Sequence, residues 1–470
     1  MSPIRKKQDK RGAPKRRLLD GVRIVDLSTV LAGPYCTMLL ADLGAEVIKI
    51  ENPNGGQYAG DFFRLPTQYH YGGIAAYFLA INRSKKSMAI DLTREEGRRI
   101  FHDLVRVSDV VFDNSRPTAL AKLGADYKTL KKVKPDIICC SLSGYGKTGP
   151  DSDKPAYDIT IQARGGSMSL TGEPGRPPVR MGLAMGDLAG SLFSAIGILA
   201  ALFSRERSAK GAMVDVALLD CQISLLTYLS EYYLIGGLVA GPQGSGHETL
   251  VPYRAYRAKD DYFTLACFHD KHWQAACRAM GREDLTTDPR YATGPARNAN
   301  KDALNRKLER IFLTRTVSQW GRLFEAHEVP WGPINTIDRA LTDRQVLARN
   351  MVTKVRHAVR GSYRSVGNPI KVSDSAEAFD PVPLCGQHTR EIMEQVLGYR
   401  SALVDGLFNS GVVGEQTARD LKALCRELRT QSKRSQTSEK PGPGTRASGR
   451  RRIKKRVGVN SGNRKTRGRS

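Results

Sequence analysis

The sequence predicts an α/β protein, with a Rossmann-like parallel sheet in a large domain and a smaller α/β domain. Short apolar runs alternate with amphipathic helical stretches over about 140 residues from Leu18, which is the pattern of βαβ units. Such units wind into a sheet that is covered by helices on both faces. The length of 470 residues allows two to four domains.

The expected elements follow one another in a regular order. The first helix, residues 34–43, begins with a proline and stops before Gly44, both common at helix ends. Strands are expected at Val22–Leu27, Glu46–Ile50, Ser87–Leu92, Asp109–Phe112, Ile137–Leu142 and Met213–Ala217. Further helices are expected at Arg94–Ser108, Ala119–Lys132, Leu188–Arg207 and Cys221–Ile235.

Two long stretches between these elements are rich in glycine. Residues 143–186 have little periodicity, and a loop of that length in a domain is usually functional. The second stretch precedes the smaller domain, where we expect a strand and three helices. They lie at Tyr262–Cys267, Trp273–Met280, Ala303–Leu313 and Ser318–His327.

Most of the formal charge of +27 lies in two basic tails. Residues 1–17 carry +7, and residues 431–470 carry fourteen Lys and Arg but only Glu439, so +13; the other 413 residues carry the remaining +7. We expect both tails to be disordered. They contain no aromatic residue for base stacking, so no specific nucleic-acid partner is expected. Salt-sensitive binding of polyanions through the tails stays open as a second hypothesis.

Composition also bounds the compartment. The eight cysteines form no CxxC pair and no Cys/His cluster, so the sequence suggests neither a disulfide framework nor a structural zinc site. No apolar segment follows the basic N-terminus as it would in a secretory signal. The longest apolar run, Leu188–Phe203, has 16 residues, whereas a membrane span needs about 20. We therefore expect a cytoplasmic protein without a membrane span.

The sequence contains none of the common motifs for nucleotide binding, serine hydrolases or zinc proteases. The turn after the first strand, Ser28–Tyr35, has one glycine where a dinucleotide fingerprint needs three. The chain also lacks a P-loop, a G-x-S-x-G elbow and an H-E-x-x-H motif.

Asp187 is the most informative single residue, at the start of the long apolar helix. It could be a simple N-cap, since aspartate is favoured there. It could also be a nucleophile, because a helix N-terminus favours the ionised carboxylate. Gly186 and Gly190 beside it would leave room for a substrate.

Six blocks of the chain resemble the class III CoA-transferase family, the CaiB/BaiF type that includes formyl-CoA transferase. The resemblance covers about residues 18–400 in family order and neither tail. The blocks are Leu19–Pro53, Asn82–Leu92, Asp113–Gly124, Ser141–Pro150, Tyr157–Asp220 and Val329–Thr336.

The resemblance implies transfer of CoA from an acyl-CoA donor to a free carboxylic acid. The family's catalytic aspartate matches Asp187, which would attack the thioester to form a mixed anhydride and then an aspartyl-CoA thioester. It implies CoA thioesters as co-substrates with no tightly bound cofactor and no metal. It also implies an interlocked homodimer.

The resemblance further implies which residues meet CoA and the acyl group. A glycine-rich lid over the substrate matches Gly244, Ser245 and Gly246. Matching CoA-contacting positions are Leu31, Ala32, Asn52, Ile90, Asp91, Leu92, Thr93, Asn114, Ser115, Arg116, Lys122, Tyr157 and Asp158.

Two positions depart from the family pattern. Asn52 replaces an arginine and Pro155 a lysine that some members carry, so two phosphate-binding charges are missing. We expect Arg83, Lys85 or Lys86 to take over the phosphate contacts, with a solvated turn as the alternative.

The domain boundaries follow from these blocks. We expect a large domain from residues 18–235 and 329–428, a small domain from 236–328, and tails at 1–17 and 429–470. Acyl-CoA racemases share the fold and remain the alternative function. Their acid/base pair needs His-Asp where this chain has Tyr157-Asp158, which favours the transferase.

Overall fold

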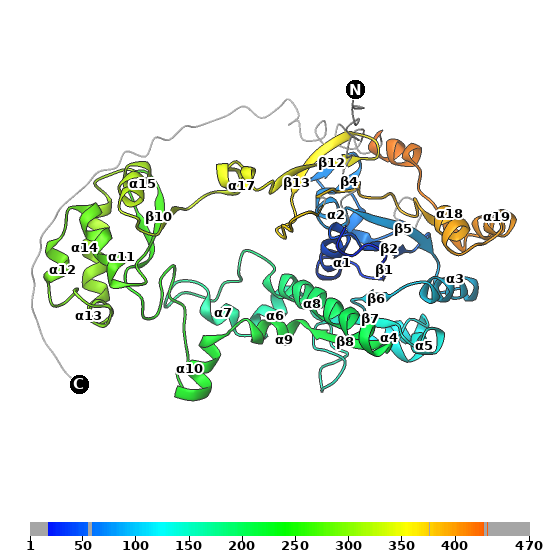
Figure 1. Cartoon of the computed structure of the whole chain (residues 1–470), viewed down its shortest axis with the longest axis horizontal. Coiled ribbons are helices and arrows are strands. Elements are labelled where there is room, and N and C mark those ends of the chain that lie inside the picture. Colours follow the sequence, from blue (N-terminus) through cyan, green and yellow to red (C-terminus); the bar gives the residue numbers. More distant parts are fainter. Residues whose placement is uncertain (1–16, 55–58, 376, 427–429, 431–470) are drawn as a thin grey trace, which may run out of the picture. The chain divides into compact units, whose positions relative to one another are not determined.

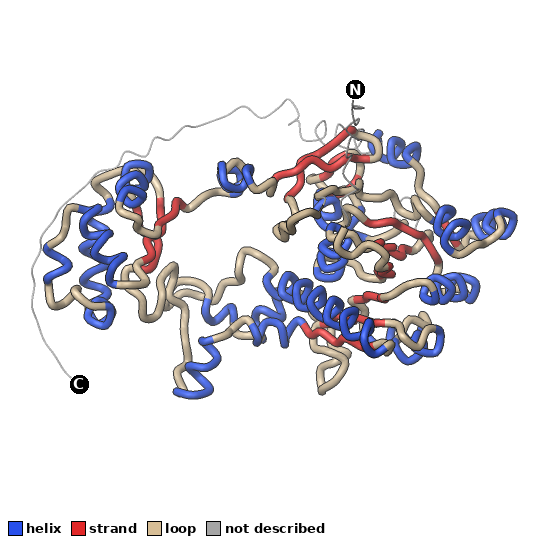
Figure 2. The backbone as a smooth tube through the Cα atoms, in the orientation of Figure 1, coloured by secondary structure: helices blue, strands red, loops and turns tan. Residues whose placement is uncertain are grey.

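A seven-stranded sheet forms the centre of the large domain (Figures 1 and 2). The computed structural model describes residues 17–54, 59–375, 377–426 and 430. The predicted tails therefore lie outside the described residues, apart from Arg17 and Thr430. The chain divides into two units, Met1–Cys425 and Arg426–Ser470, and everything below concerns the first.

The strand order β14-β5-β2-β1-β6-β7-β8 is that of a Rossmann-like sheet with one added edge strand. All neighbours pair in parallel except β14, which runs antiparallel to β5. The C-terminal part of the chain thus completes the sheet begun by the N-terminal part, as predicted. The strands are β1 (Arg23–Asp26), β2 (Glu46–Glu51), β5 (Lys85–Ile90), β6 (Val110–Asp113), β7 (Ile138–Ser143), β8 (Ala212–Ala217) and β14 (Val413–Gly414).

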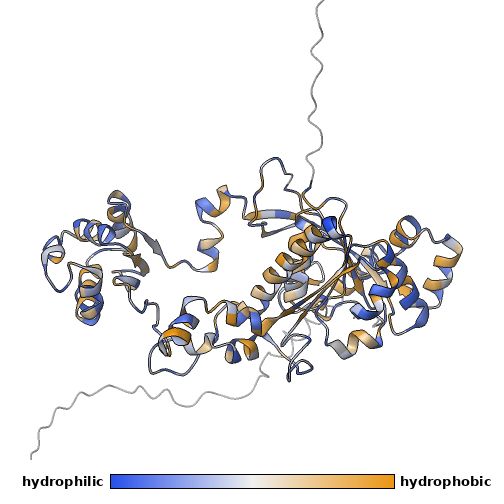
Figure 3. Ribbon diagram, turned by 60° about the horizontal axis from the view of Figure 1, so that its bottom comes forward, coloured by the Kyte–Doolittle hydropathy of each residue, from blue (hydrophilic) through white to orange (hydrophobic). Residues whose placement is uncertain are grey.

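Helices cover both faces of the sheet because its strands are apolar on both sides, as the orange colouring of the central strands shows (Figure 3). Ile24 packs on the face of α1 and α8, and its neighbour Val25 packs on the opposite face, with α3, α5 and α19. The helices of this part are α1 (Ala32–Asp42), α2 (Ala76–Ile81), α3 (Glu95–Arg106), α4 (Pro117–Lys122), α5 (Tyr127–Val133), α6 (Asp158–Arg164), α7 (Ser167–Leu170), α8 (Met185–Ser208), α9 (Leu218–Ser224), α10 (Tyr228–Gly236), α18 (Thr389–Glu391), the π-helical η3 (Ile392–Val396) and α19 (Ser401–Asn409).

Residues 251–329 enclose a hydrophobic core of their own. Trp273, Trp320 and Phe312 lie at its centre, fully buried. Its three-stranded sheet has the order β11-β10-β9. The elements are β9 (Tyr253–Arg257), β10 (Tyr262–Ala266), β11 (Trp331–Pro333), α11 (Asp270–Met280), α12 (Asp284–Thr287), α13 (Gly294–Ala299), α14 (Lys301–Phe312) and α15 (Val317–Ala326). The predicted domain boundaries near residues 235 and 328 stay predictions.

Short elements connect these parts. Two antiparallel hairpins pair β3 with β4 and β12 with β13. The bounds are η2 (Phe62–Arg64), β3 (His70–Tyr71), β4 (Ile74–Ala75), α16 (Ile337–Ala340), α17 (Arg344–Ala348), β12 (Val352–His357) and β13 (Gly361–Val366).

Two helices that the sequence predicts as continuous are broken in the structure. The stretch 119–132 divides into α4 and α5 at Gly124, whose φ of +66° is left-handed. The stretch 221–235 divides into α9 and α10 at Thr227, with φ +49°. Helical periodicity continues across both breaks, so it did not reveal them.

Helix α8 is the one described helix that could cross a membrane by length and composition. It packs against β7, β8 and α1.

A buried ion pair between Lys85 and Asp26 joins β5 to β1. The Lys85 ammonium lies 3.0 Å from Asp26 Oδ2 and also donates to Pro34 O and Asn82 Oδ1, both at 2.9 Å. Its three protons are thus all accepted inside the protein. Burial still lowers the pKa of Lys85 to about 8, whereas the neighbouring cations and hydrogen bonds outweigh burial and hold the pKa of Asp26 at about 2.

Replacing Lys85 with methionine should lower the free energy of unfolding by about 3–5 kcal/mol, because Asp26 is left buried and unpaired. The neighbouring Lys86 forms half-exposed pairs with Glu46 and Glu391, so Lys86→Met should cost only about 0–1 kcal/mol. Urea unfolding of both variants at pH 7 measures the difference. Equal losses of unfolding free energy in the two variants would contradict the stabilising role of the buried Lys85–Asp26 pair.

Candidate functional site

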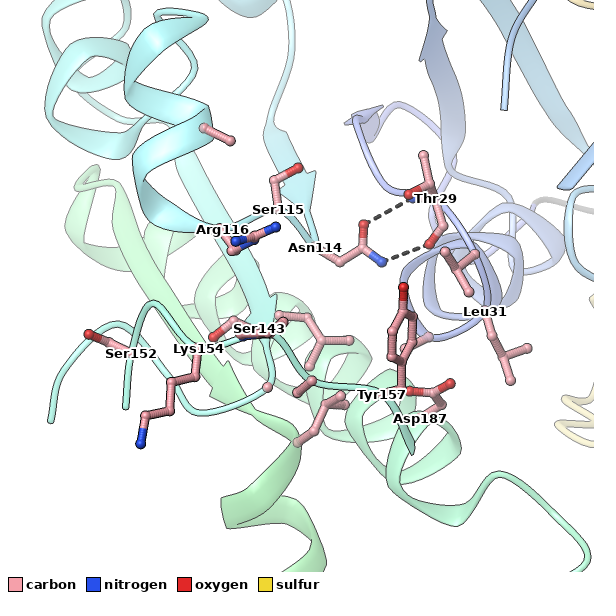
Figure 4. Close-up of a pocket in the computed structure, with 18 residues that line it drawn as sticks. Thr29, Leu31, Asn114, Ser115, Arg116, Ser143, Ser152, Lys154, Tyr157 and Asp187 are labelled. Carbon is pink, nitrogen blue, oxygen red and sulfur yellow. Dashed lines mark hydrogen bonds between the residues drawn. The ribbon is translucent and has the colours of Figure 1, made fainter. Parts of the chain in front are cut away.

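The carboxyl ends of β1, β6 and β7 open into a cavity of about 350 Å³. In this sheet β1 lies between β2 and β6, and the chain leaves β1 for β2 on one side and returns later on the other. Such a switch point leaves a crevice beyond the strand ends, where α/β proteins bind ligands. Figure 4 shows the lining side chains.

Seven of the predicted residues line this cavity. They are Leu31, Ala32, Asn114, Ser115, Arg116, Tyr157 and Asp187. In Figure 4, Asp187 and Tyr157 lie at one end, and Arg116 and Lys154 at the other. The pocket therefore has a carboxylate end and a cationic end.

The wall on the β1 side is held by a pair of reciprocal hydrogen bonds. Asn114 Oδ1 accepts from the Thr29 N–H at 2.9 Å, and Asn114 Nδ2 donates to Thr29 O at 2.7 Å (Figure 4). The next residue, Val30, has φ +71°, which is strained for a β-branched residue. The strained turn brings the chain to Leu31, where α1 begins.

Asp187 lies in the first turn of α8 and is not its N-cap, so the N-cap interpretation is wrong. The N-cap is Ala184, whose side chain makes no capping bond. The capping role falls to Asp158, the first residue of α6, whose Oδ1 accepts the Gly186 N–H at 2.9 Å. Asp158 is 9% exposed, and its Oδ2 accepts from Gln162 Nε2 at 2.8 Å.

The electrostatics of Asp187 are unusual for a helix N-terminus. Burial, with the negative charge of Asp158 adding to it, raises the pKa of Asp187 to about 6. No hydrogen bond or ion pair from the described residues to its carboxylate offsets these two causes. The carboxylate thus stays largely ionised at neutral pH, yet it is more basic than an exposed aspartate.

Tyr77, in α2, is a neighbour that sequence reasoning missed. Burial, followed by the charges of Asp187, Asp61 and Asp158, raises the pKa of Tyr77 to about 12. Its hydroxyl therefore keeps its proton and can donate a hydrogen bond beside the carboxylate.

The glycines beside Asp187 do not make room for a substrate as expected. A Cβ on Gly190 would meet Leu218 and Leu142, and one on Gly186 would come within 3.2 Å of Asp158. Both positions are occupied by the protein's own side chains. These glycines instead let α8 approach α6, α9 and β7 closely.

The expected replacement of the phosphate-binding cations is wrong for Arg83 and Lys85. Arg83 is buried against Asp42, and Lys85 is buried against Asp26. Lys86 is held by Glu46 and Glu391. Arg83 and Lys85 are therefore neither available to a phosphate nor part of a solvated turn, whereas the phosphate role of half-exposed Lys86 stays a prediction.

The remaining predicted residues lie outside the lining of this cavity, and their roles stay predictions. Gly244, with φ +59°, donates its N–H to Gly172 O at 2.9 Å, and Ser245 Oγ accepts from Ala255 N. Asp91, at the end of β5, accepts from Thr93 and Asn54. The others outside are Asn52, Ile90, Leu92, Lys122, Asp158 and Gly246.

The lining includes further residues that the sequence analysis did not select. Ser143 is the last residue of β7 and Gly144 follows it, so the sheet order would have pointed to them. Lys154, next to Pro155, places a cation in the lining, where it also pairs with Asp151 at 2.5 Å. The other unpredicted lining residues are Thr29, Val30, Ala119, Leu142, Ser152, Pro155, Ala156 and Leu218.

Comparison with known proteins agrees with this geometry. The profile of CoA-transferase family III matches residues 19–389. Succinyl-CoA:glutarate CoA-transferase of Mus musculus is 38% identical over 396 residues, which are 84% of this chain and 90% of that protein. Succinyl-CoA:mesaconate CoA-transferase of Haloarcula hispanica is 36% identical over 80% of this chain and 96% of that protein.

A solved structure has the same fold. The CAIB/BAIF family protein from Brucella suis superposes with a TM-score of 0.71 at 37% identity, over 80% of this chain and 99% of that one. The Rossmann-like sheet, the pocket at its switch point and these similarities lead to one conclusion: the chain is a CoA-transferase and belongs to CoA-transferase family III.

Proposed function

We propose that Asp187 carries the CoA group between the two acids. Its carboxylate attacks the thioester carbonyl of the donor, and CoA leaves as the thiolate, giving a mixed anhydride. The thiolate then attacks the Asp187 carbonyl, which releases the donor acid and leaves an aspartyl-CoA thioester. The acceptor carboxylate repeats the two steps in reverse order, which restores Asp187 and yields the new acyl-CoA.

The observation that carries this proposal is the free, partly buried carboxylate of Asp187 at one end of the pocket. A nucleophile must be ionised but not held by strong hydrogen bonds, and a pKa of about 6 meets both requirements. The opposite end carries Arg116 and Lys154, whose charges suit the phosphates of CoA, although Lys154 also forms an exposed ion pair with Asp151.

Donors for the developing oxyanion are available around Asp187. The hydroxyl of Tyr77 can donate a hydrogen bond, and the first turn of α8 supplies a positive dipole end. Each would stabilise the negative charge that grows on the carbonyl oxygen during attack.

The transferase is favoured over the racemase by the residue beside Asp158. A racemase base at position 157 must accept a proton near neutral pH, whereas an ordinary tyrosine has a pKa of about 10.

We further propose that the acceptor is a dicarboxylic acid. The relatives named above act on glutarate and mesaconate, which both carry two carboxyl groups. One carboxyl group would react with Asp187 and the other would need a cation. Arg180 supplies one: its guanidinium is half-exposed and lies 3.8 Å from Asp158, which binds the residue before Asp187.

We also propose that the protein is a homodimer. Less than half of the apolar window of α8 is buried in the single chain. Leu192, Ile196, Leu199 and Phe203 recur at helical spacing and are exposed. A stripe of this kind normally faces another protein surface, and a second copy of the chain would cover it.

Replacing Asp187 with asparagine should abolish turnover while leaving the fold intact. It should also raise the free energy of unfolding at pH 8 by about 1–3 kcal/mol, since ionising a group of raised pKa costs stability above that pKa. Below the unfolded pKa both states are protonated, so the gain should vanish at pH 3.5. Steady-state kinetics and urea unfolding give both results, and retained turnover would exclude the mechanism.

The pH profile of turnover should show an acid limb near pH 6, because the reaction needs ionised Asp187. Asp158→Asn keeps an oxygen for the Gly186 N–H but removes the charge that raises the pKa of Asp187. The limb should then move to lower pH. Asp153→Asn, which removes an exposed carboxylate from the same loop region, is the control and should leave the limb in place.

Arg180→Met should raise the KM for glutarate or succinate at least about tenfold, as expected for loss of a charge-assisted hydrogen bond. The KM for a monocarboxylic acceptor such as butyrate should change little. A uniform effect on both acceptors would contradict the proposed role of Arg180.

Sedimentation velocity should give the mass of a dimer for the wild-type chain. Ile196→Glu places a charge in the apolar stripe and should shift the protein toward monomer, whereas Lys210→Glu, beyond the end of α8, should not. A wild-type protein that sediments only as monomer at micromolar concentration would contradict the dimer.

A further inference from the structure

Ser191 joins the helix of the nucleophile to the wall of the pocket. It lies one turn after Asp187 on α8 and is fully buried. Its hydroxyl is 2.6 Å from Ala32 O, at the start of α1, and 2.8 Å from Asp187 O.

The two contacts differ in what they do. A serine that donates to the carbonyl four residues earlier makes an ordinary contact within a helix. The contact with Ala32 O links residues 159 positions apart and connects α8 with α1. The hydroxyl has one proton, which is therefore shared between the carbonyl oxygens of Ala32 and Asp187.

The loop that ends at Ala32 is fixed at its other end by buried charges. Asp26 Oδ1 accepts from both the N–H and the hydroxyl of Ser28, at 2.9 and 2.5 Å. The ammonium of Lys49, itself paired with Asp61 at 3.0 Å, donates to Ser28 O at 2.5 Å. All four side chains are at most 4% exposed.

Between these ends the loop lines the cavity through Thr29, Val30 and Leu31. Asn114 binds Thr29 from β6, as described above. The loop is therefore tied to the sheet at Ser28 and Thr29, and to α8 through Ser191. Within the described residues, no other side-chain hydrogen bond joins this loop or Ala32 to the first two turns of α8.

We propose that Ser191 is a positioning residue, which holds the backbone of Asp187 at a fixed distance from the wall Thr29–Leu31. A thioester bound against that wall would then meet the carboxylate at reacting distance. The inference rests on the proposed role of Asp187 as nucleophile. Orientation of this kind acts on the reaction step more than on binding.

The test compares Ser191→Ala with Ser194→Ala. Ser194 is an equally buried hydroxyl on the same helix, but it makes no hydrogen bond to the loop. Ser191→Ala should lower kcat, and the single-turnover rate of adduct formation at saturating succinyl-CoA, about 5- to 10-fold, as expected for one lost buried hydrogen bond. The KM for succinyl-CoA should stay within about twofold, because the wall itself remains tied to the sheet. Ser194→Ala should leave all three values unchanged.

Three results would overturn the proposal: an unchanged kcat in Ser191→Ala, an equal loss in Ser194→Ala, or a change confined to KM. The midpoint of thermal unfolding is measured for both variants, so that a general loss of structure is detected by an equal drop in activity and stability. Asp187→Asn is included as a separate arm. Turnover in that variant would exclude the proposed function itself, whereas an inactive Asp187→Asn with a fully active Ser191→Ala would exclude only the positioning role.

Discussion

The buried carboxylate of Asp26 is the constraint on which the site depends. It lies at the end of the central strand, fully inside the protein, and binds Lys85, Thr37 and both polar groups of Ser28. A buried charge is tolerated only when its hydrogen-bonding capacity is satisfied. Here the partners come from β5, α1 and the loop after β1. Satisfying one carboxylate therefore fixes the turn that shapes the pocket.

The strained Val30 fits this arrangement. A β-branched residue in the left-handed region persists only where its surroundings determine the backbone. Ser28 is held by Asp26 and Lys49, and Thr29 by Asn114, so the chain has little freedom before Val30. The same turn brings Leu31 and the N-terminus of α1 to the pocket, where a helix end favours an anionic ligand.

The ionised carboxylate of Asp187, the proposed nucleophile, lowers the stability of the fold, because burial and Asp158 raise its pKa. An aspartate with a hydrogen-bonded, solvated carboxylate would be more stable but a weaker nucleophile. Asp158 takes over the capping of α8, which frees Asp187 from that role and adds a repulsive charge nearby. Because Asp158 binds the Gly186 N–H at the start of α8, the carboxylate of Asp187 is left to line the pocket.

The features of the fold that depend on local sequence pattern were predicted from the sequence. Alternating apolar periodicity predicted the parallel sheet and the position of α8, and the motif blocks predicted Asp187, Asn114 and Arg116 at the pocket. Prediction failed where partners are distant in the chain. Arg83 and Lys85 looked like free cations because Asp42 and Asp26 are 41 and 59 residues away. Tyr77 carries no motif, and only the fold brings it to Asp187. The contact of Ser191 with Ala32 likewise depends on the fold, because the two residues are 159 positions apart.

The most direct test of the proposed mechanism is intact-mass and peptide mass spectrometry of the enzyme, quenched after mixing with succinyl-CoA without an acceptor. The account predicts a CoA adduct confined to the peptide that contains Asp187, lost on adding glutarate and absent in Asp187→Asn. An adduct on another residue, or full turnover with no adduct at any quench time, would contradict it.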